Sequence, residues 1–272
     1  IFFIYCIFDW DNKGISVNGQ WLSHLRFADD IVLIGESVAN VQLRLDQLDQ
    51  AGAAVGLKMN LAKTKWMRNL QAANNNIHIG QKEIEQVDSY VYLGQELTAG
   101  HKNSRELARR RRAAWVSYAS IAEVVTNTAD ATLRAHQFNS TVLPAMLYGA
   151  ETWSLTAADR QKLAVTKRAL EWRMVGVKRT DHISNKLLRK KSKVKDAVNQ
   201  ADQAKKRWTG HVARRSDGRW TRAVTEWLPL DIKRPLGRPA TRWRDSLRQD
   251  IGRDWMGLAR DQKAWRSCCG LR

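Results

Sequence analysis

The chain has 272 residues, of which 43% are hydrophobic, and its 46 Lys and Arg outnumber its 27 Asp and Glu to give a net charge of +19. A chain of this length can bury a real core in one large or two modest domains. Its three cysteines, Cys6 and the adjacent Cys268 and Cys269, exclude a disulfide framework and a zinc-binding spacing, and they favour a reducing compartment.

The charge is distributed unevenly along the chain. Residues 1–100 hold 8 Lys and Arg against 11 Asp and Glu, whereas residues 101–272 hold 38 against 16. Clustered cations gain affinity for a phosphate backbone because they release its condensed counterions. The second part is therefore expected to bind a polyanion, and a solvated surface without a partner is the alternative.

The chain opens with the apolar run Ile1–Phe8. This run is too short to span a bilayer, and it lacks the basic flank and the small-residue cleavage site of a secretion signal. We interpret it as a buried strand or helix end cut from something longer, and we expect no membrane contact.

Two apolar runs flank an acidic pair within residues 25–34. Val, Ile and Phe suit strands, so this stretch predicts a tight hairpin whose tip carries Asp29 and Asp30. Neighbouring carboxylates repel each other, and a fold that holds them together usually offsets the repulsion with a cation such as Mg²⁺ or Mn²⁺. An acidic pair is also typical of a plain polar turn.

The other signals in the first hundred residues predict an α+β unit. Asn18-Gly19 is a strong hairpin signal. A helix with one apolar face is predicted from the N-cap Ser37 to Gly56. Short strands are expected near residues 64–67, 77–79 and 90–93. The helix would pack its apolar face beneath the sheet.

Three motifs in this unit resemble those of a known family. Phe27–Asp30 (Phe-Ala-Asp-Asp) resembles the catalytic hairpin of reverse transcriptases of non-LTR, LINE-like retrotransposons of the RTE type. Gly56–Lys65 resembles the next motif of their palm subdomain, and Tyr90–Gly94 resembles the hairpin that holds the primer strand. The motifs follow one another in the order found in the family, and the similarity extends over nearly the whole chain.

The resemblance implies an RNA-directed DNA polymerase whose partners are an RNA template, a DNA primer or target, and deoxynucleotides. Asp29 and Asp30 would be its catalytic residues and would hold two Mg²⁺ or Mn²⁺ ions about 4 Å apart, with Asp29 the stronger candidate for direct coordination. Tyr92, Leu93 and Gly94 would belong to the primer-holding hairpin.

Lys63 or Lys65 could place a positive charge near the departing pyrophosphate, where it would stabilise developing negative charge. A surface lysine without this role is the alternative at both positions. The family's Cys/His zinc knuckle has no counterpart in this chain, so no metal besides the polymerase ions is expected.

The family pattern also includes a third carboxylate, on a strand well before the Asp-Asp hairpin. Only Asp9 and Asp11 precede Asp29, and neither fits that pattern. The chain is therefore expected to be truncated, without the fingers and the first metal-binding strand, and to bind nucleic acid without polymerising by itself. Missing strands would leave an unpaired hydrophobic edge, so poor solubility or association is also expected.

Helical periodicity begins after Gly100. A helix capped by Ser104 is predicted to carry four successive arginines: Arg109, Arg110, Arg111 and Arg112. Four consecutive residues cover all sides of a helix, so some of them must face away from its core and can contact a nucleic-acid backbone. By resemblance, residues 101–180 would form the thumb, which follows the template-primer duplex.

Residues 181–272 form the last predicted region, which is basic and rich in Trp. Lys190 and Lys191 lie in a run dense enough for nucleic-acid contact or nuclear import, although a solvated helix face fits equally well. Arg238 lies in a stiff stretch between two prolines and is predicted to be a connector or a nucleic-acid contact. Trp residues interleaved with cations can stack on bases, but a role in a helical core is favoured here.

These observations predict an α+β chain. An incomplete reverse-transcriptase palm, made of an antiparallel sheet and a helix, would occupy residues 1–100 and precede all-α thumb and C-terminal regions. The predicted function is a fragment of a reverse transcriptase, and the alternative is a non-catalytic basic module that binds RNA or DNA. The expected localisation is nuclear, cytoplasmic or both.

Overall fold

A computed structural model describes residues 10, 13–69, 75–100, 103–227 and 241–271. The predictions made for Cys6, Asp9, Asp11 and Arg238 lie outside the described residues. The described parts of residues 1–102 and 216–234 form one compact unit, and those of residues 103–215 and 235–272 form a second.

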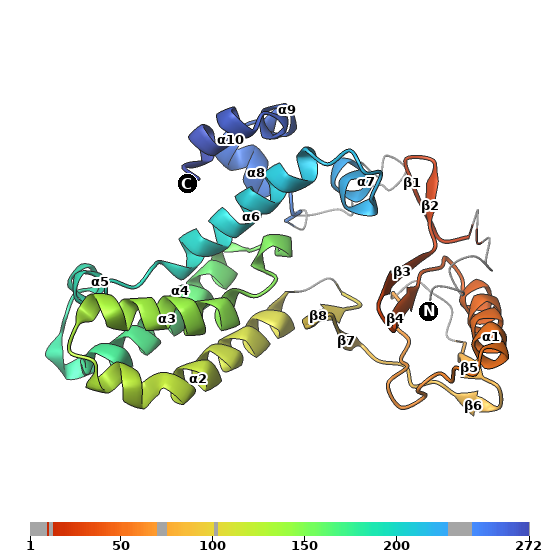
Figure 1. The fold of residues 1–272 in the computed structure, drawn as a ribbon, viewed down its shortest axis with the longest axis horizontal. Coiled ribbons are helices and arrows are strands. Elements are labelled where there is room, and N and C mark those ends of the chain that lie inside the picture. Colours follow the sequence, from red (N-terminus) through yellow and green to blue (C-terminus); the bar gives the residue numbers. More distant parts are fainter. Residues whose placement is uncertain (1–9, 11–12, 70–74, 101–102, 228–240, 272) are drawn as a thin grey trace. The chain divides into compact units, whose positions relative to one another are not determined.

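Four antiparallel hairpins provide the strands of the first unit (Figure 1). They pair β1 (Ile15–Val17) with β2 (Gln20–Leu22), β3 (His24–Phe27) with β4 (Asp30–Leu33), β5 (His78–Ile79) with β6 (Lys82–Glu83), and β7 (Ser89–Tyr92) with β8 (Gln95–Thr98). Among the described residues each hairpin is a separate two-stranded sheet. The strand predicted at residues 64–67 is reduced to a single bridge between Trp66 and Gln86.

All four hairpins turn through two residues, and the first of the two has a left-handed backbone. Its φ is 50° at Asn18, 52° at Ala28, 58° at Gly80 and 47° at Leu93. Asn and Gly adopt this conformation at low cost, whereas the Cβ atoms of Ala and Leu are crowded there. The turns that carry the acidic pair and the Tyr-Leu-Gly motif are therefore strained.

Helix α1 (Val38–Ala54) begins where the sequence predicts it. The hydroxyl of Ser37 accepts a hydrogen bond from the backbone N–H of Asn40, and Gly56 follows the helix with a φ of 75°. The buried Leu45 packs against Ile79 and the neighbouring apolar residues of the β5–β6 segment. The first unit also contains a short helix, α7 (Trp220–Glu226).

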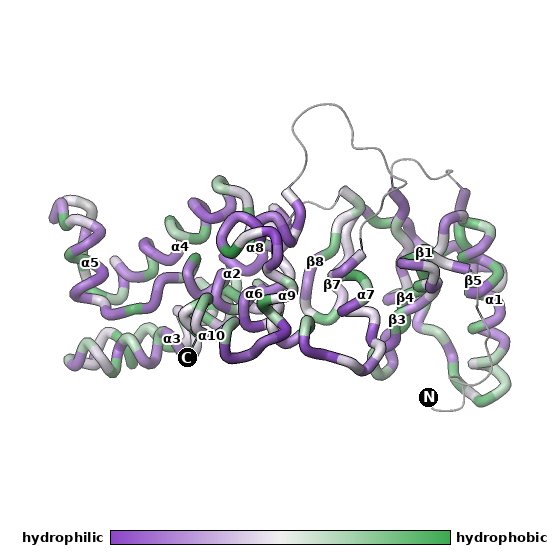
Figure 2. The backbone as a smooth tube through the Cα atoms, turned by 90° about the horizontal axis from the view of Figure 1, so that it is seen from above, coloured by the Kyte–Doolittle hydropathy of each residue, from purple (hydrophilic) through white to green (hydrophobic). Residues whose placement is uncertain are grey.

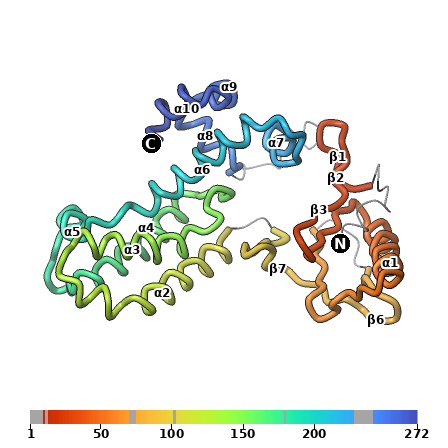
Figure 3. Tube along the Cα trace, in the orientation of Figure 1, coloured from red at the N-terminus to blue at the C-terminus, as the bar shows by residue number. Residues whose placement is uncertain are grey.

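The main core of the second unit is formed by residues of α2 (Ser104–Asn127), α3 (Ala131–Leu147), α4 (Ala157–Val175) and α6 (Ala197–Ala213) (Figures 1 and 3). Their fully buried centre includes Phe138, Leu163 and Leu170. Helix α5 (Asn185–Ser192) packs against α3 and α4. Two short 3-10 helices, η2 (Ala150–Thr152) and η3 (Arg179–Asp181), lie in the connections. The cap of α2 falls on Asn103, so Ser104 is its first helical residue and not its cap as predicted.

Three short helices complete this unit: α8 (Asp245–Ile251), α9 (Trp255–Arg260) and α10 (Gln262–Cys269). They surround the buried Leu247, Trp255 and Trp265 and pack against the end of α6. The favoured core role is thus confirmed for these two tryptophans. No helix in the described ranges is long and apolar enough to cross a membrane.

Candidate functional site

Asp29 and Asp30 lie at the tip of the β3–β4 hairpin, as the sequence predicts. Phe27 pairs with Asp30 across the two strands, and Ala28 and Asp29 form the loop between them. Both acidic residues are exposed. The tip therefore presents two neighbouring carboxylates, the oxygen ligands that Mg²⁺ and Mn²⁺ prefer.

The base of this hairpin is held by Arg44, which projects from α1 and is completely buried. Its guanidinium donates hydrogen bonds to the carbonyls of Ser23 (2.9 Å), Ile34 (2.7 Å) and Asn40 (3.2 Å). Ser23 precedes β3 and Ile34 follows β4, so one side chain bonds to both strands at the base of the hairpin. A Cβ atom at Gly35 would lie 2.6 Å from the guanidinium, so a larger residue there would displace Arg44 from its hydrogen bonds.

An aromatic contact extends this support. The indole N–H of Trp10 donates to the side-chain oxygen of Gln47 at 2.9 Å, and the Trp10 ring meets the ring of His24 edge-on at 5.2 Å. The guanidinium carbons of Arg26 and Arg44 lie 5.6 and 5.9 Å from the centre of the Trp10 ring. Burial, and then the charges of these two arginines, lower the pKa of His24. His24 is therefore neutral at pH 7, which avoids a third cation beneath the hairpin.

The other two sequence motifs lie in the same unit, and Met59 and Leu61 of the Gly56–Lys65 motif pack against the same apolar cluster as Leu33 of β4. The hydroxyl of Tyr90 donates to the carbonyl of Lys63 at 3.2 Å, which joins the Tyr-Leu-Gly hairpin to the Gly-Leu…Lys-Thr motif. Burial, and then the negative charge of Asp30, raise the pKa of Tyr92. Tyr92 is therefore close enough to Asp30 to sense its charge. Leu93 and Gly94 form the loop beyond Tyr92.

The two candidate lysines have different surroundings. The Nζ atom of Lys65 lies 2.5 Å from Oε2 of Glu85, so its charge is already paired. Lys63 is exposed, and its backbone N–H is held by the side-chain oxygen of Asn60 at 3.1 Å. Of these two positions, Lys63 has the side chain that is more available to an incoming anion.

Within the described part of the chain, no group of three or more His, Cys, Asp and Glu side chains is placed to hold a metal ion. The acidic tip supplies two carboxylates from Asp29 and Asp30. This donor set fits a hard divalent cation that takes its remaining ligands from water or from phosphate oxygens.

The arginine run on α2 is divided between interior and surface. Arg109 and Arg110 both bind the carboxylate of the buried Glu106, with closest distances of 2.8 and 2.6 Å. Arg111 donates to a threonine hydroxyl on α4. Arg112 is exposed. Three of the four guanidinium groups therefore stabilise the helical core, and Arg112 is the member best placed to contact a phosphate.

Helix α5 presents the other predicted cations. Lys190 and Lys191 are exposed, and the helix is largely hydrophilic (Figure 2). Its opposite side is anchored at Glu171 of α4, which accepts a hydrogen bond from the hydroxyl of Ser192 at 2.7 Å. Oxygen Oε1 of Glu171 also lies 2.8 Å from Nζ of the buried Lys167, which is ion-pair distance although the angle is not that of a hydrogen bond.

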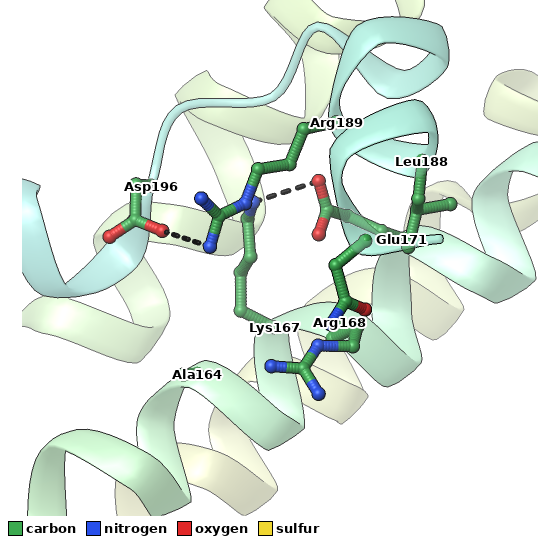
Figure 4. A pocket seen from close by; sticks show the side chains of 8 residues that line it. Ala164, Lys167, Arg168, Glu171, Leu188, Arg189 and Asp196 are labelled. Atoms are coloured by element: carbon green, nitrogen blue, oxygen red, sulfur yellow. Dashed lines mark ion pairs between the residues drawn. The ribbon is translucent and has the colours of Figure 1, made fainter. Parts of the chain in front are cut away.

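Figure 4 shows Glu171 beside a small pocket between α4 and α5. Lys167 points to Glu171, and Arg189 pairs with Asp196 at 3.3 Å. The centre of a water molecule can occupy a volume of about 10 Å³ in this pocket, which is enough for a single water. A nucleotide does not fit in this volume. The Arg189–Asp196 pair joins α5 to the N-terminal cap of α6.

Sequence reasoning missed Arg44 and the buried Lys205 of α6. Arg44 follows Val41 by three positions and precedes Leu48 by four, so it lies on the apolar face of its own helix. A cation on the apolar face of a helix predicts a buried side chain, so this pattern was available in the sequence. No comparable signal marks Lys205, whose partners come from segments about 40 and 50 residues away in the sequence.

Comparison with known proteins finds no matching family model. A protein of Caenorhabditis elegans described as transposon-derived is 39% identical over 268 residues, and the match covers 92% of this chain and 96% of that protein. The similarity therefore spans both compact units and includes the region of the acidic hairpin.

Proposed function

The chain belongs to the same family of transposon-derived proteins as this nematode relative, and on that premise we propose that it is part of a reverse transcriptase of a non-LTR retrotransposon. The observation that carries this proposal is the strained two-residue hairpin whose tip exposes both Asp29 and Asp30. Three motifs that resemble one enzyme family thus lie in a single compact unit. A plain polar turn would need none of this support.

In this proposal the reaction is RNA-templated DNA synthesis. A primer 3′-hydroxyl attacks the α-phosphate of a deoxynucleotide, and pyrophosphate leaves. Asp29 and Asp30 would hold Mg²⁺ or Mn²⁺ ions, which when bound stabilise the charge on the attacking and leaving oxygens. Arg44 keeps both ends of the hairpin in register, and Lys63 would attract the pyrophosphate.

Metal binding by the acidic tip can be tested without catalysis. A titration with Mn²⁺ followed by electron paramagnetic resonance measures the free ion. The Asp29→Asn variant should bind Mn²⁺ at least about tenfold more weakly, because it loses one charged ligand. Asp88→Asn, at another exposed position of the same unit, is the matched control and should bind as the unmodified chain does. Equal binding by both variants would contradict the proposal.

Primer extension on a primed RNA template with Mg²⁺ or Mn²⁺ then tests the reaction itself. Extension that Asp29→Asn removes and Asp88→Asn retains would establish polymerisation by this chain. Lack of extension together with carboxylate-dependent Mn²⁺ binding would mean that the chain supplies a metal-binding part of a larger active site.

The exposed lysines of α5 favour a second candidate function, a non-catalytic module that binds RNA or DNA. Binding would then weaken steeply with salt, because phosphate contacts release counterions. The slope of log affinity against log salt is negative for such binding. The double substitution Lys190→Glu with Lys191→Glu should reduce the magnitude of this slope by about one to two. The same charge change at the exposed Lys58 and Lys82 of the first unit should leave the slope unchanged.

A further inference from the structure

Helix α10 has two chemically different faces. Trp265 on one side is 1% exposed and belongs to the C-terminal core. On the other side Gln262, Lys263, Arg266 and Ser267 are all exposed. At about 100° per residue these four positions cover an arc of about 140°. The exposed face thus combines an amide, two cations and a hydroxyl.

This helix is firmly supported from behind. The carboxylate of Asp261 accepts the backbone N–H groups of Lys263 (2.8 Å) and Ala264 (3.1 Å) and so caps its first turn. The indole N–H of Trp265 donates to the carbonyl of Lys206 on α6 at 2.9 Å. A Cβ atom at Gly210 of α6 would lie 2.7 Å from the Trp265 ring, so the helices approach closely. The exposed face is therefore formed before any ligand binds, which lowers the entropy cost of binding.

The two preceding helices, α8 and α9, are also held by α6. Arg214 of α6 donates to the carbonyl of Ala259 on α9 at 2.9 Å, and Lys206 pairs with Asp250 at 3.2 Å. Residues 241–271 contain seven Arg and Lys against four Asp. The C-terminal helices thus form a rigid, net positive element with α10 as its last helix.

We propose that α10 enters the major groove of duplex DNA and reads base edges with Gln262 and Arg266, while Lys263 contacts a phosphate. Arg pairs with the two acceptors of guanine in that groove, and Gln pairs with the donor and acceptor of adenine. Eight helical residues extend for about 12 Å, which corresponds to three or four base pairs. This role is separate from the proposed polymerase hairpin and does not rest on it.

The chemistry of the face favours duplex DNA over RNA. The major groove of B-form DNA is about 12 Å wide and admits a helix, whereas that of an A-form RNA duplex is too narrow for side chains to read. Single strands are held largely by aromatic stacking. The aromatic residue of α10, Trp265, is buried in the core, so the exposed face has no stacking surface of its own.

The test is a selection of duplexes with a random central sequence, performed with the full chain. We expect enrichment of a motif of about three or four base pairs that contains guanine. Lys263→Ala with Arg266→Ala should weaken binding to that motif by at least about tenfold. Arg248→Ala with Arg253→Ala removes the same charge from exposed positions of the same unit and should cost less than about threefold. Methylation of guanine N7, which lies in the major groove, should block binding.

Three results would overturn the proposal: no enriched sequence, equal losses in the two double variants, or equal competition by duplex RNA. Circular dichroism of each variant shows whether it has folded. Asp29→Asn should leave the selected motif unchanged, so failure of this proposal and failure of the polymerase proposal can be distinguished.

Discussion

The guanidinium of Arg44 donates a hydrogen bond of 2.7 Å to the carbonyl of Ile34, and through it α1 holds the end of the strand that starts at Asp30. The same side chain donates to Ser23 just before the partner strand. Burial lowers the pKa of Arg44, yet the group stays charged because arginine loses its proton only far above pH 7. A fixed cation thus lies under the hairpin whose tip carries two anions.

Replacing Arg44 by Met should therefore destabilise the first unit. The carbonyl of Ser23 would lose its guanidinium donor in a buried site, and we expect a loss of about 2–4 kcal/mol in the free energy of unfolding. Urea denaturation measures this loss. Met at the exposed Lys58 is the control and should change stability by less than about 0.5 kcal/mol. Equal effects at the two positions would show that the three hydrogen bonds contribute nothing net.

Replacing Ala28 by glycine should stabilise the protein. Its φ of 52° is left-handed, where a Cβ atom is crowded, so Ala28→Gly should raise the free energy of unfolding by about 0.5–1 kcal/mol. Ala51→Gly within α1 should instead lower it by about the same amount, because glycine weakens a helix interior. Urea denaturation of both variants should give opposite signs. A loss of stability in Ala28→Gly would mean that the turn is not strained.

The proximity of Tyr92 to Asp30 can be measured by titrating tyrosine absorbance. Asp30→Asn removes a negative charge that disfavours the phenolate, so the pKa of Tyr92 should fall toward its usual value. Burial is the larger cause of the raised pKa, so we expect only part of the shift to disappear. A Tyr92→Phe variant identifies the signal, and Asp88→Asn should leave it in place. An unchanged titration in Asp30→Asn would show that the two motifs are not in electrostatic contact.

Lys205 should make stability depend on pH. Burial lowers its pKa from 10.5 to about 8, and its ammonium donates to the carbonyl of Trp153 and the hydroxyl of Ser246. Between about pH 8 and pH 10.5 the unfolded chain still binds a proton that the folded chain has lost, so the contribution of this group to stability rises with pH. The unfavourable contribution of the buried charge is fully present below about pH 8.

Urea denaturation from about pH 7 to about pH 10 tests this dependence. The stability of Lys205→Met relative to the unmodified chain should be highest near pH 7 and should decline by up to about 3 kcal/mol as the pH rises. Lys191→Met, at an exposed position of α5, should show no such trend. A difference that is constant with pH would place the pKa of Lys205 near its usual value.

The elements that local interactions specify were predictable. The two apolar runs around Asp29 and Asp30, the Asn18-Gly19 turn and the Ser37 cap each act within a few residues, and the structure confirms all of these elements. The strand predicted near Trp66 depended on a partner strand, and the structure has only one bridge there. Local pattern cannot decide that outcome, because a strand requires a neighbour.

Which cations are buried and which are exposed could be decided only from the tertiary structure. Four consecutive arginines look alike in the sequence, yet Arg110 is buried against Glu106 while Arg112 is exposed, because the surrounding helices cover only part of α2. In the same way Trp265 became a core residue and left Arg266 on the surface.

The sequence by itself determined the acidic hairpin, the helix that follows it, the separation of acidic from basic halves and the resemblance to a retrotransposon enzyme. Only the tertiary structure decided that Arg44 holds the base of that hairpin and that Lys205 is buried. The physical reason is that burial and carbonyl contacts arise between segments distant in the chain, whereas turns, caps and periodicity are properties of neighbouring residues.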